Sequence, residues 1–204
     1  MNESDQWGLE RKIVHVIDRE ADTLGRMRQW DAQGHQFLVR CDDRRVKWND
    51  RSILLSEIGE HFDSEVLFES GGDALYRGTP VSQQVAETEV VLYRPHSEVI
   101  DGEKTSVPGR PLTVRLVVTR LIDQDGYVVA QWMLLTNVFE TAISAYQIAL
   151  WYYWRWLIET YFKLLKSHGI ELEQWQQQTG EAIARRILVA SMACVVVYGC
   201  LLYT

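Results

Sequence analysis

The amino-acid sequence predicts an α/β protein in which a small antiparallel β unit separates a strand-helix-strand unit from a helical part. A short apolar, β-branched run at Lys12–Ile17 is followed by a helix-compatible stretch and a second short strand, so residues 1–40 form a strand-helix-strand unit. Residues 41–136 carry strand-like runs between Gly and Pro turns. Residues 137–204 carry long helical stretches. We therefore divide the chain into these three parts.

In the first part, the helix is expected over Ala21–Ala32 and the second strand over Gln36–Arg40. Asp18 directly follows the first strand. A carboxylate at the C-terminal end of a strand in an open α/β sheet lies where ligands and metals usually bind. The alternative for Asp18 and for Asp22 is a helix cap. We expect Asp22 to be the cap, and both roles stay open for Asp18.

The middle part has the pattern of a small antiparallel β unit. Strands rich in Val, Leu and Thr are expected at Ala86–Tyr93, Leu112–Ile122 and Tyr127–Thr136. Turns are expected where glycine and proline cluster, at Gly71-Gly72, Gly78–Pro80, Pro95, Gly102 and Pro108–Pro111.

The last part is expected to be helical. Asn137 lies three residues before Glu140, which is an N-cap arrangement, and Val138–Ser167 lacks Gly and Pro. His168-Gly169 is expected to end the second of these helices. The uncharged stretch Ile187–Tyr203 supplies a last helix, which we expect to be buried in the core, and a membrane crossing is the alternative at this length.

Composition indicates a folded protein of a reducing compartment. The 204 residues are 47% hydrophobic, which excludes a disordered chain. The net charge of −7 argues against nucleic acid, but residues 51–136 hold thirteen acids against seven bases, so the acid excess lies in the middle part. The three cysteines form no CxxC pair and the first residues hold no apolar run, so we expect a cytoplasmic protein with free thiols and no signal peptide.

One predicted helix carries several polar and charged side chains on a single face. At about 100° per residue, Tyr152, Arg155, Glu159, Lys163 and Lys166 share one narrow face, opposite an apolar arc that we expect to anchor the helix. The first interpretation is a solvated face with ordinary ion pairs. The second is a phosphate-binding face on which the glutamate holds a divalent cation. The order of residues alone leaves both open.

Two motifs resemble those of a known family. Tyr152-x2-Arg155-x3-Glu159-x6-Lys166 has the spacing of the YREK signature, and the string Asp18–Asp22 resembles the block that holds a second catalytic aspartate. On these residues the chain is similar to bacterial insertion-sequence transposases of the cut-and-paste DDE class. The resemblance covers essentially the whole chain but only part of the family's length.

The resemblance implies a ribonuclease-H-like core in which two aspartates and one glutamate hold two Mg²⁺ or Mn²⁺ ions. It implies that Asp18 is the second aspartate and Glu159 the glutamate, both catalytic and both metal ligands. It further implies that Tyr152, Arg155 and Lys166 contact DNA.

Trp132 resembles the tryptophan that ends the family's β insertion and stacks on a flipped base. The alternative is a core tryptophan on an apolar strand. The partners implied are double-stranded DNA at transposon ends and a second copy in a homodimer. No membrane is implied, and localisation is expected to be cytoplasmic, with nucleoid association on DNA.

The chain departs from the family at the first aspartate. Only seventeen residues precede Asp18, so the first core strands are expected to be missing, and Asp5 lies in a polar leader. We therefore expect a fragment, a partial ribonuclease-H-like core that is inactive alone, so whether these 204 residues are an enzyme stays open. The alternatives are a non-catalytic product that binds DNA or inhibits a full-length partner, and a membrane-associated protein anchored through Ile187–Tyr203. The five histidines show no ligand spacing, and we expect them to be structural.

Overall fold

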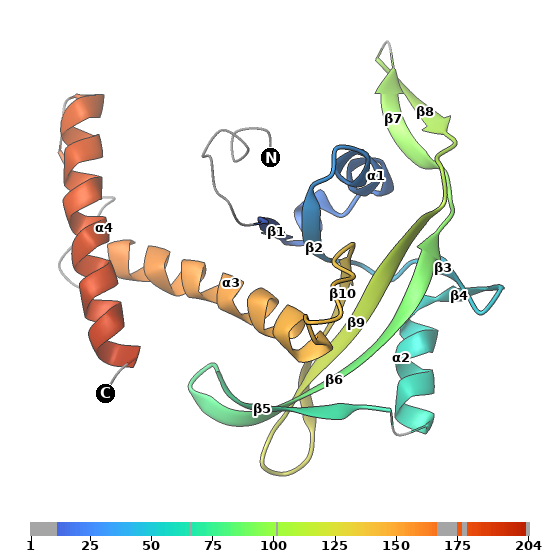
Figure 1. The fold of residues 1–204 in the computed structure, drawn as a ribbon. Coiled ribbons are helices and arrows are strands. Elements are labelled where there is room, and N and C mark those ends of the chain that lie inside the picture. Colours follow the sequence, from blue (N-terminus) through green and yellow to red (C-terminus); the bar gives the residue numbers. More distant parts are fainter. Residues whose placement is uncertain (1–11, 66, 101, 167–174, 177–178, 203–204) are drawn as a thin grey trace. The chain divides into compact units, whose positions relative to one another are not determined.

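The computed structural model describes residues 12–65, 67–100, 102–166, 175–176 and 179–202. The chain forms two compact units, Met1–Tyr152 and Tyr153–Thr204. The first unit holds a mostly antiparallel sheet with helices, and the described residues form a mixed α/β fold (Figure 1). The ends of the predicted last two helices, at His168-Gly169 and Tyr203, lie outside the described residues.

The predicted strand-helix-strand unit is present. β1 (Val14–Ile17) leads through a 3₁₀ turn (Arg19–Ala21) and α1 (Leu24–Ala32) into β2 (Gln36–Arg40). The two strands pair in parallel, as a βαβ connection requires.

The predicted antiparallel unit continues the same sheet. Strands are paired in the order β1-β2-β10-β9-β6-β3-β4, with β5 on β6. The longer strands of this sheet are β5 (Glu69–Tyr76), β6 (Thr79–Leu92), β9 (Leu112–Ile122) and β10 (Val128–Thr136). The remaining elements are β3 (Arg45–Trp48), β4 (Arg51–Leu54), α2 (Leu55–Ser64) and the separate hairpin β7 (His96–Ile100) and β8 (Glu103–Val107).

One predicted turn of this region is absent and another is present. Gly71-Gly72 lies inside β5 at a bulge instead of forming a turn, and a Cβ at Gly71 would come within 2.8 Å of the Tyr146 ring. The pair of glycines therefore makes room for an aromatic ring of the following helix. The turn predicted at Gly78 is confirmed, with positive φ at Arg77 (53°) and Gly78 (82°), as a two-residue hairpin loop requires.

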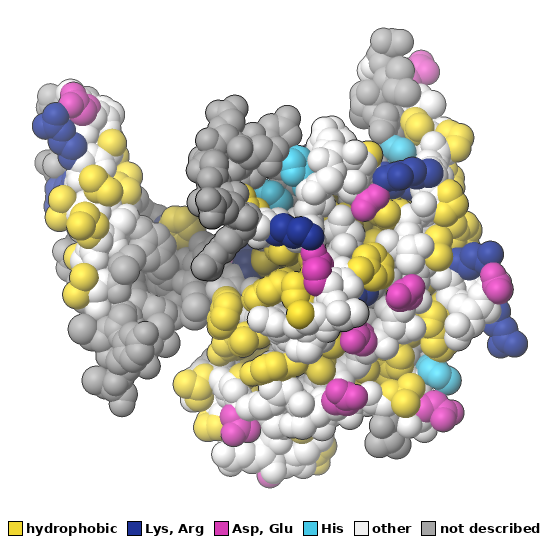
Figure 2. Space-filling model, in the orientation of Figure 1, with side chains coloured by type: hydrophobic (Ala, Val, Ile, Leu, Met, Phe, Trp, Pro, Cys, Tyr) yellow, Lys and Arg dark blue, Asp and Glu magenta, His cyan; other side chains and the backbone are white. Residues whose placement is uncertain are grey.

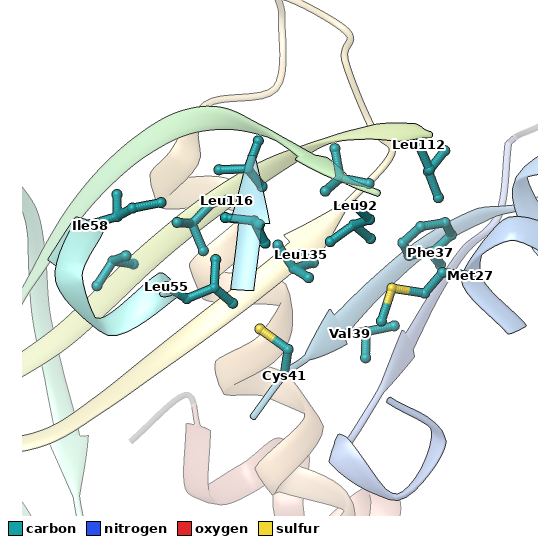
Figure 3. Packing of buried hydrophobic residues seen from close by; sticks show 14 of the residues in the cluster. Met27, Phe37, Val39, Cys41, Leu55, Ile58, Leu92, Leu112, Leu116 and Leu135 are labelled. Atoms are coloured by element: carbon teal, nitrogen blue, oxygen red, sulfur yellow. The ribbon is translucent and has the colours of Figure 1, made fainter. Parts of the chain in front are cut away.

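The core lies between the sheet and the helices of the first unit. One cluster joins α1, α2 and the strands, with Met27, Phe37, Leu55, Ile58 and Leu116 all 0% exposed (Figure 3). A second cluster joins the sheet to the first turns of α3 (Ala145–Lys166), where Ala145, Ile148, Ala149 and Tyr152 form a stripe at helical spacing.

The helix α3 begins seven residues later than the sequence predicts. Its first turn is capped by Ser144, whose Oγ accepts a hydrogen bond from the backbone N of Gln147 (3.2 Å). Arg115, a buried residue of β9, donates from Nη1 to the carbonyl oxygens of Val138 (3.0 Å) and Ile143 (3.1 Å). These contacts hold the segment before α3 in a non-helical path.

The predicted N-cap role of Asn137 is therefore wrong. Its Oδ1 accepts a hydrogen bond from the backbone N of Phe37 (2.9 Å), and its Nδ2 donates to the carbonyl of His35 (3.0 Å). Glu140 likewise contacts β2 and the segment before β1, since Oε1 accepts from Gln36 (2.6 Å) and from Lys12 Nζ (2.8 Å). Both side chains tie the connection before α3 to β2.

These contacts predict an acid-sensitive contribution to stability from Glu140. The hydrogen bonds from Lys12 and Gln36 lower the pKa of Glu140 from 4.5 to about 2. A depressed pKa in the folded state stabilises the fold above pH 4.5, and this contribution is lost as the pH falls towards 2. The Lys12 side chain is 76% exposed, so solvent screening limits the contribution to about 1 kcal/mol. Urea unfolding across this pH range should show that loss in the wild type and not in Glu140→Gln; parallel profiles would contradict the assignment.

The second unit contains the rest of α3 and α4 (Gly180–Leu202). The expectation of a buried last helix is wrong for several of its residues, because Leu188, Val189, Met192 and Val196 are 62–68% exposed. Hydrophobic side chains are visible along α4 in Figure 2. Within the described part of the chain, no helix has both the length and the apolar character needed to cross a membrane.

Candidate active site at the carboxyl ends of β1 and β2

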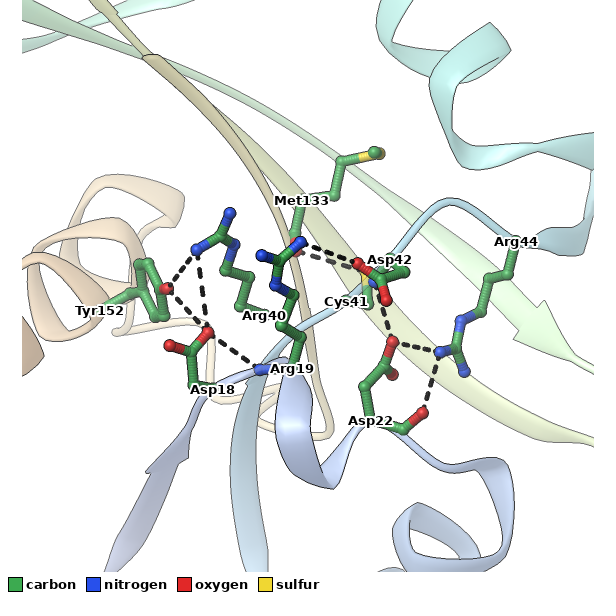
Figure 4. A network of polar contacts seen from close by, with 9 residues as sticks. All are labelled: Asp18, Arg19, Asp22, Arg40, Cys41, Asp42, Arg44, Met133 and Tyr152. Carbon is green, nitrogen blue, oxygen red and sulfur yellow. Dashed lines mark hydrogen bonds and ion pairs between the residues drawn. The ribbon is translucent and has the colours of Figure 1, made fainter.

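The parallel register brings an acidic and a basic residue together. Ile17 of β1 pairs with Val39 of β2, so Asp18 and Arg40 are the next residues along two adjacent strands. Both lie at the carboxyl ends of parallel strands, where open α/β sheets place their ligands. Figure 4 shows the two side chains directed towards each other.

Three groups contact the same oxygen of Asp18. Its Oδ1 accepts a hydrogen bond from the backbone N of Arg19 (2.9 Å) and one from the Tyr152 hydroxyl (3.3 Å). The Arg40 Nη1 lies 3.8 Å from this oxygen. Asp18 is thus the N-cap of the 3₁₀ turn and a member of a polar group at the strand ends, and its ligand-binding role stays a prediction.

Asp22 does not cap α1, contrary to the prediction. The cap is Thr23, whose Oγ1 accepts from the backbone N of Arg26 (3.4 Å). The Asp22 carboxylate, 3% exposed, instead pairs with Arg44 and accepts a hydrogen bond from the backbone N of Asp42 (2.8 Å). Burial raises the pKa of the Asp22 carboxyl above its ordinary value, and Arg44 offsets this only in part. This pair fastens the loop after β1 to the loop after β2.

Cys41 lies beside this group but has no nucleophilic character. It is a free, buried thiol whose Sγ donates to the carbonyl of Met133 (3.3 Å). Burial raises the pKa of the Cys41 thiol well above its ordinary value, so it stays protonated at neutral pH.

The signature helix α3 is not arranged as its sequence predicts. Tyr152, predicted on the polar face, is 0% exposed, whereas Trp154, predicted on the anchoring arc, is 50% exposed. The reason is that the first turns of α3 pack on the sheet through the stripe that ends at Tyr152. In the second unit, Arg155 Nη2 lies 3.4 Å from Glu159 Oε1, whose side chain is 54% exposed. Lys163 and Lys166 are exposed.

Trp132 lies in the core beneath this site. It is 6% exposed, and its ring contacts Tyr76 (centroids 6.1 Å apart) and Tyr152 (6.0 Å). These contacts fit the alternative given by the sequence, a core tryptophan on an apolar strand. Base stacking by Trp132 stays a prediction.

Arg40 is the residue that sequence reasoning missed. The signal was present, because the predicted strand Gln36–Arg40 ends in a charged side chain just as the preceding strand ends at Asp18. Parallel pairing of the two predicted strands would have placed these residues side by side.

The donor chemistry at the site suits a hard divalent ion. The carboxylate oxygens of Asp18 are the kind of ligand that Mg²⁺ and Mn²⁺ prefer. Within the residues that the structure describes, however, no group of three or more His, Cys, Asp or Glu side chains is placed to hold a metal.

These features define an α/β domain with a carboxylate-bearing polar site at the carboxyl ends of a parallel strand pair. The family described as "Transposase DDE domain" matches residues 1–195. The chain therefore belongs to the transposase DDE domain family, whose members act on DNA and generally depend on divalent metal ions. No curated protein matches the chain significantly.

Proposed function

We propose that this chain is the catalytic part of an insertion-sequence transposase of the YREK class, which cleaves and joins DNA strands at the ends of the element. The observation that carries the proposal is the position of Asp18 at the carboxyl end of β1, in a chain that the transposase family matches over residues 1–195. The YREK spacing on α3 supports the same class. Double-stranded transposon ends as substrate, a homodimer, nucleoid association and a ribonuclease-H-like core belong to this proposal.

Asp18 and Glu159 are the proposed metal ligands and catalytic residues. Their carboxylates supply hard oxygen donors, which fit Mg²⁺ or Mn²⁺. Bound divalent ions would supply activation of the attacking oxygen and stabilisation of the leaving one. Arg40, 3.8 Å from Asp18, keeps a positive charge at the site and would favour an approaching phosphate.

Arg155 and Lys166 are the proposed contacts to the DNA backbone. Both carry fixed positive charge on the helix that bears Glu159, and contacts of this kind position a duplex without reading its sequence. The resemblance also assigns DNA contacts to Tyr152, as a member of the signature, and to Trp132, as the tryptophan that ends the β insertion. Their burial, 0% and 6% exposed, means that either contact requires the site to open.

We also propose that the 204 residues alone do not cleave DNA. The two-ion chemistry of the class uses three carboxylates, and this sequence offers matches to two, Asp18 and Glu159. The alternative function is then a non-catalytic chain that binds DNA or inhibits an intact transposase. Adding the purified chain to an active transposase tests it: a fall in cleavage supports inhibition, and unchanged cleavage rejects it.

Replacing Glu159 tests the assignment directly. In an active transposase that contains this chain, Glu159→Gln should abolish strand cleavage and leave binding of the transposon end intact, since it removes a charge from the metal site but no phosphate contact. Glu181→Gln is the matched control, because Glu181 forms the same i,i+4 pair with Arg185 on α4. Cleavage assays with gel-shift binding give both readouts, and a Glu159→Gln protein that cleaves as well as the control would refute the role.

A further inference from the structure

The contacts around Asp18 form a directed chain of hydrogen bonds. Arg40 Nη1 lies 3.5 Å from the Tyr152 hydroxyl, which lies 3.3 Å from Asp18 Oδ1. A guanidinium can only donate hydrogen bonds, whereas a phenol has one proton to donate. The Tyr152 hydroxyl oxygen therefore accepts a hydrogen bond from Arg40, and the hydroxyl donates a hydrogen bond to Asp18.

The Tyr152 side chain, which donates the hydrogen bond to Asp18, is packed in the core. Tyr152 is 0% exposed and ends the stripe through which α3 packs on the sheet. Its ring lies against Trp132, with the centroids 6.0 Å apart and the planes tilted by 56°. Trp132 in turn meets Tyr76 edge to face at 6.1 Å. An aromatic side chain packed in this way has little rotameric freedom, so its hydroxyl has a defined position.

The acceptor is held from three directions. The Arg19 backbone N, the Tyr152 hydroxyl and the Arg40 guanidinium all converge on Oδ1 of Asp18 (Figure 4). Contacts on one oxygen from groups on β2, α3 and the 3₁₀ turn determine the rotation of the carboxylate about its side-chain bonds. A carboxylate held in this way presents its other oxygen in one direction.

We propose that Tyr152 is a positioning residue for Asp18. Its ring packs against Trp132 and its hydroxyl accepts a hydrogen bond from Arg40. The hydroxyl then holds the Asp18 carboxylate in the single rotamer that presents it for cation binding. This inference rests on the proposed function of Asp18 as a metal ligand. It gives Tyr152 a role within the folded domain that does not depend on contact with DNA.

Removing the Tyr152 hydroxyl tests the orientation itself. In the isotopically labelled chain, three-bond NMR couplings across the Asp18 Cα–Cβ bond should report one rotamer in the wild type and averaged rotamers in Tyr152→Phe. Tyr76→Phe is the matched control, because Tyr76 also packs on Trp132, and its couplings should equal those of the wild type. Thermal unfolding separates a general loss of structure from the local effect. Unchanged Asp18 couplings in Tyr152→Phe, or averaged couplings in the wild type, would overturn the proposal.

Iron-directed backbone cleavage connects the orientation to cation binding. Fe²⁺ with ascorbate and peroxide should cut the chain near Asp18, and Tyr152→Phe should need about tenfold more Fe²⁺ for the same cutting, the usual cost of losing a group that orients a ligand. Asp18→Asn should remove these cuts. If Asp18→Asn cuts like the wild type, the metal role of Asp18 fails while the NMR result still decides the positioning. If Asp18→Asn alone loses the cuts, the metal role stands and the positioning role is rejected.

Discussion

Asp18→Asn is expected to lower DNA strand cleavage by an active transposase containing this chain by at least about a thousandfold, because a divalent ion contributes several kcal/mol to the transition state. The substitution keeps the size of the side chain and its hydrogen-bond acceptor at Oδ1, but removes the negative charge that a cation requires. Binding of the transposon end should change little. Single-turnover cleavage and a gel-shift titration measure the two effects separately.

Asp42→Asn provides the control for this substitution. Asp42 lies in the neighbouring loop, where its exposed carboxylate is 3.4 Å from Arg19, and the proposal gives it no metal contact. It should cleave like the wild type. Equal losses in both variants would show that charge in this region matters in general and that Asp18 has no special role.

Trp132→Ala is expected to reduce the free energy of unfolding by about 3–5 kcal/mol, the usual cost of deleting a large buried aromatic side chain. The indole is 6% exposed and packs between Tyr76 and Tyr152, so its removal leaves a cavity behind the site. Trp154→Ala is the control, because Trp154 is 50% exposed and its loss should change stability by no more than about 0.5 kcal/mol. Urea unfolding followed by circular dichroism compares the two. Equal, small effects would contradict a structural role for Trp132.

Two substitutions of Trp132 bear on base stacking. A fold weakened by Trp132→Ala loses DNA cleavage indirectly, whereas Trp132→Phe retains most of the packing but offers a smaller ring for stacking on a base. Reduced cleavage in Trp132→Phe at unchanged stability would therefore favour the base-stacking role that the resemblance implies.

The parallel unit and the long strands were predictable because their signals are local. The β-branched run before Asp18, the apolar run at Gln36–Arg40 and the alternation in Leu112–Ile122 each specify a strand within a few residues. Once a strand-helix-strand unit is recognised, the topology of α/β sheets indicates the strand end as the place for Asp18. The family match over residues 1–195 agrees with the resemblance at the level of a DDE transposase.

The errors came from tertiary contacts that no local pattern reports. Asn137 has the sequence context of a helix cap, yet its amide satisfies the backbone of β2, a hundred residues away along the chain. Asp22 has the position of a cap, yet Arg44 recruits it into a buried ion pair. In each case a side chain capable of capping met a stronger partner after folding.

The helical wheel failed on α3 for a related reason. A wheel assumes one buried face along the whole helix, but α3 belongs to both compact units, and the described residues that pack it on the sheet lie between Ala145 and Tyr152. The residue predicted to lie on the exposed face is therefore the most buried of the signature. The short helix α2 was not predicted at all, because its ten residues lie within a region whose composition indicates strands.

A metal-specificity switch at Asp18 tests the central claim most directly. In an active transposase containing this chain, Asp18→Cys replaces a hard oxygen ligand with a soft thiolate, which binds Mn²⁺ or Cd²⁺ in preference to Mg²⁺. The account predicts cleavage that is absent in Mg²⁺ and restored by Mn²⁺ or Cd²⁺, while Asp42→Cys cleaves in Mg²⁺ like the wild type. Full cleavage by Asp18→Cys in Mg²⁺, or no cleavage with any of the three ions, would contradict the assignment of Asp18 as a metal ligand.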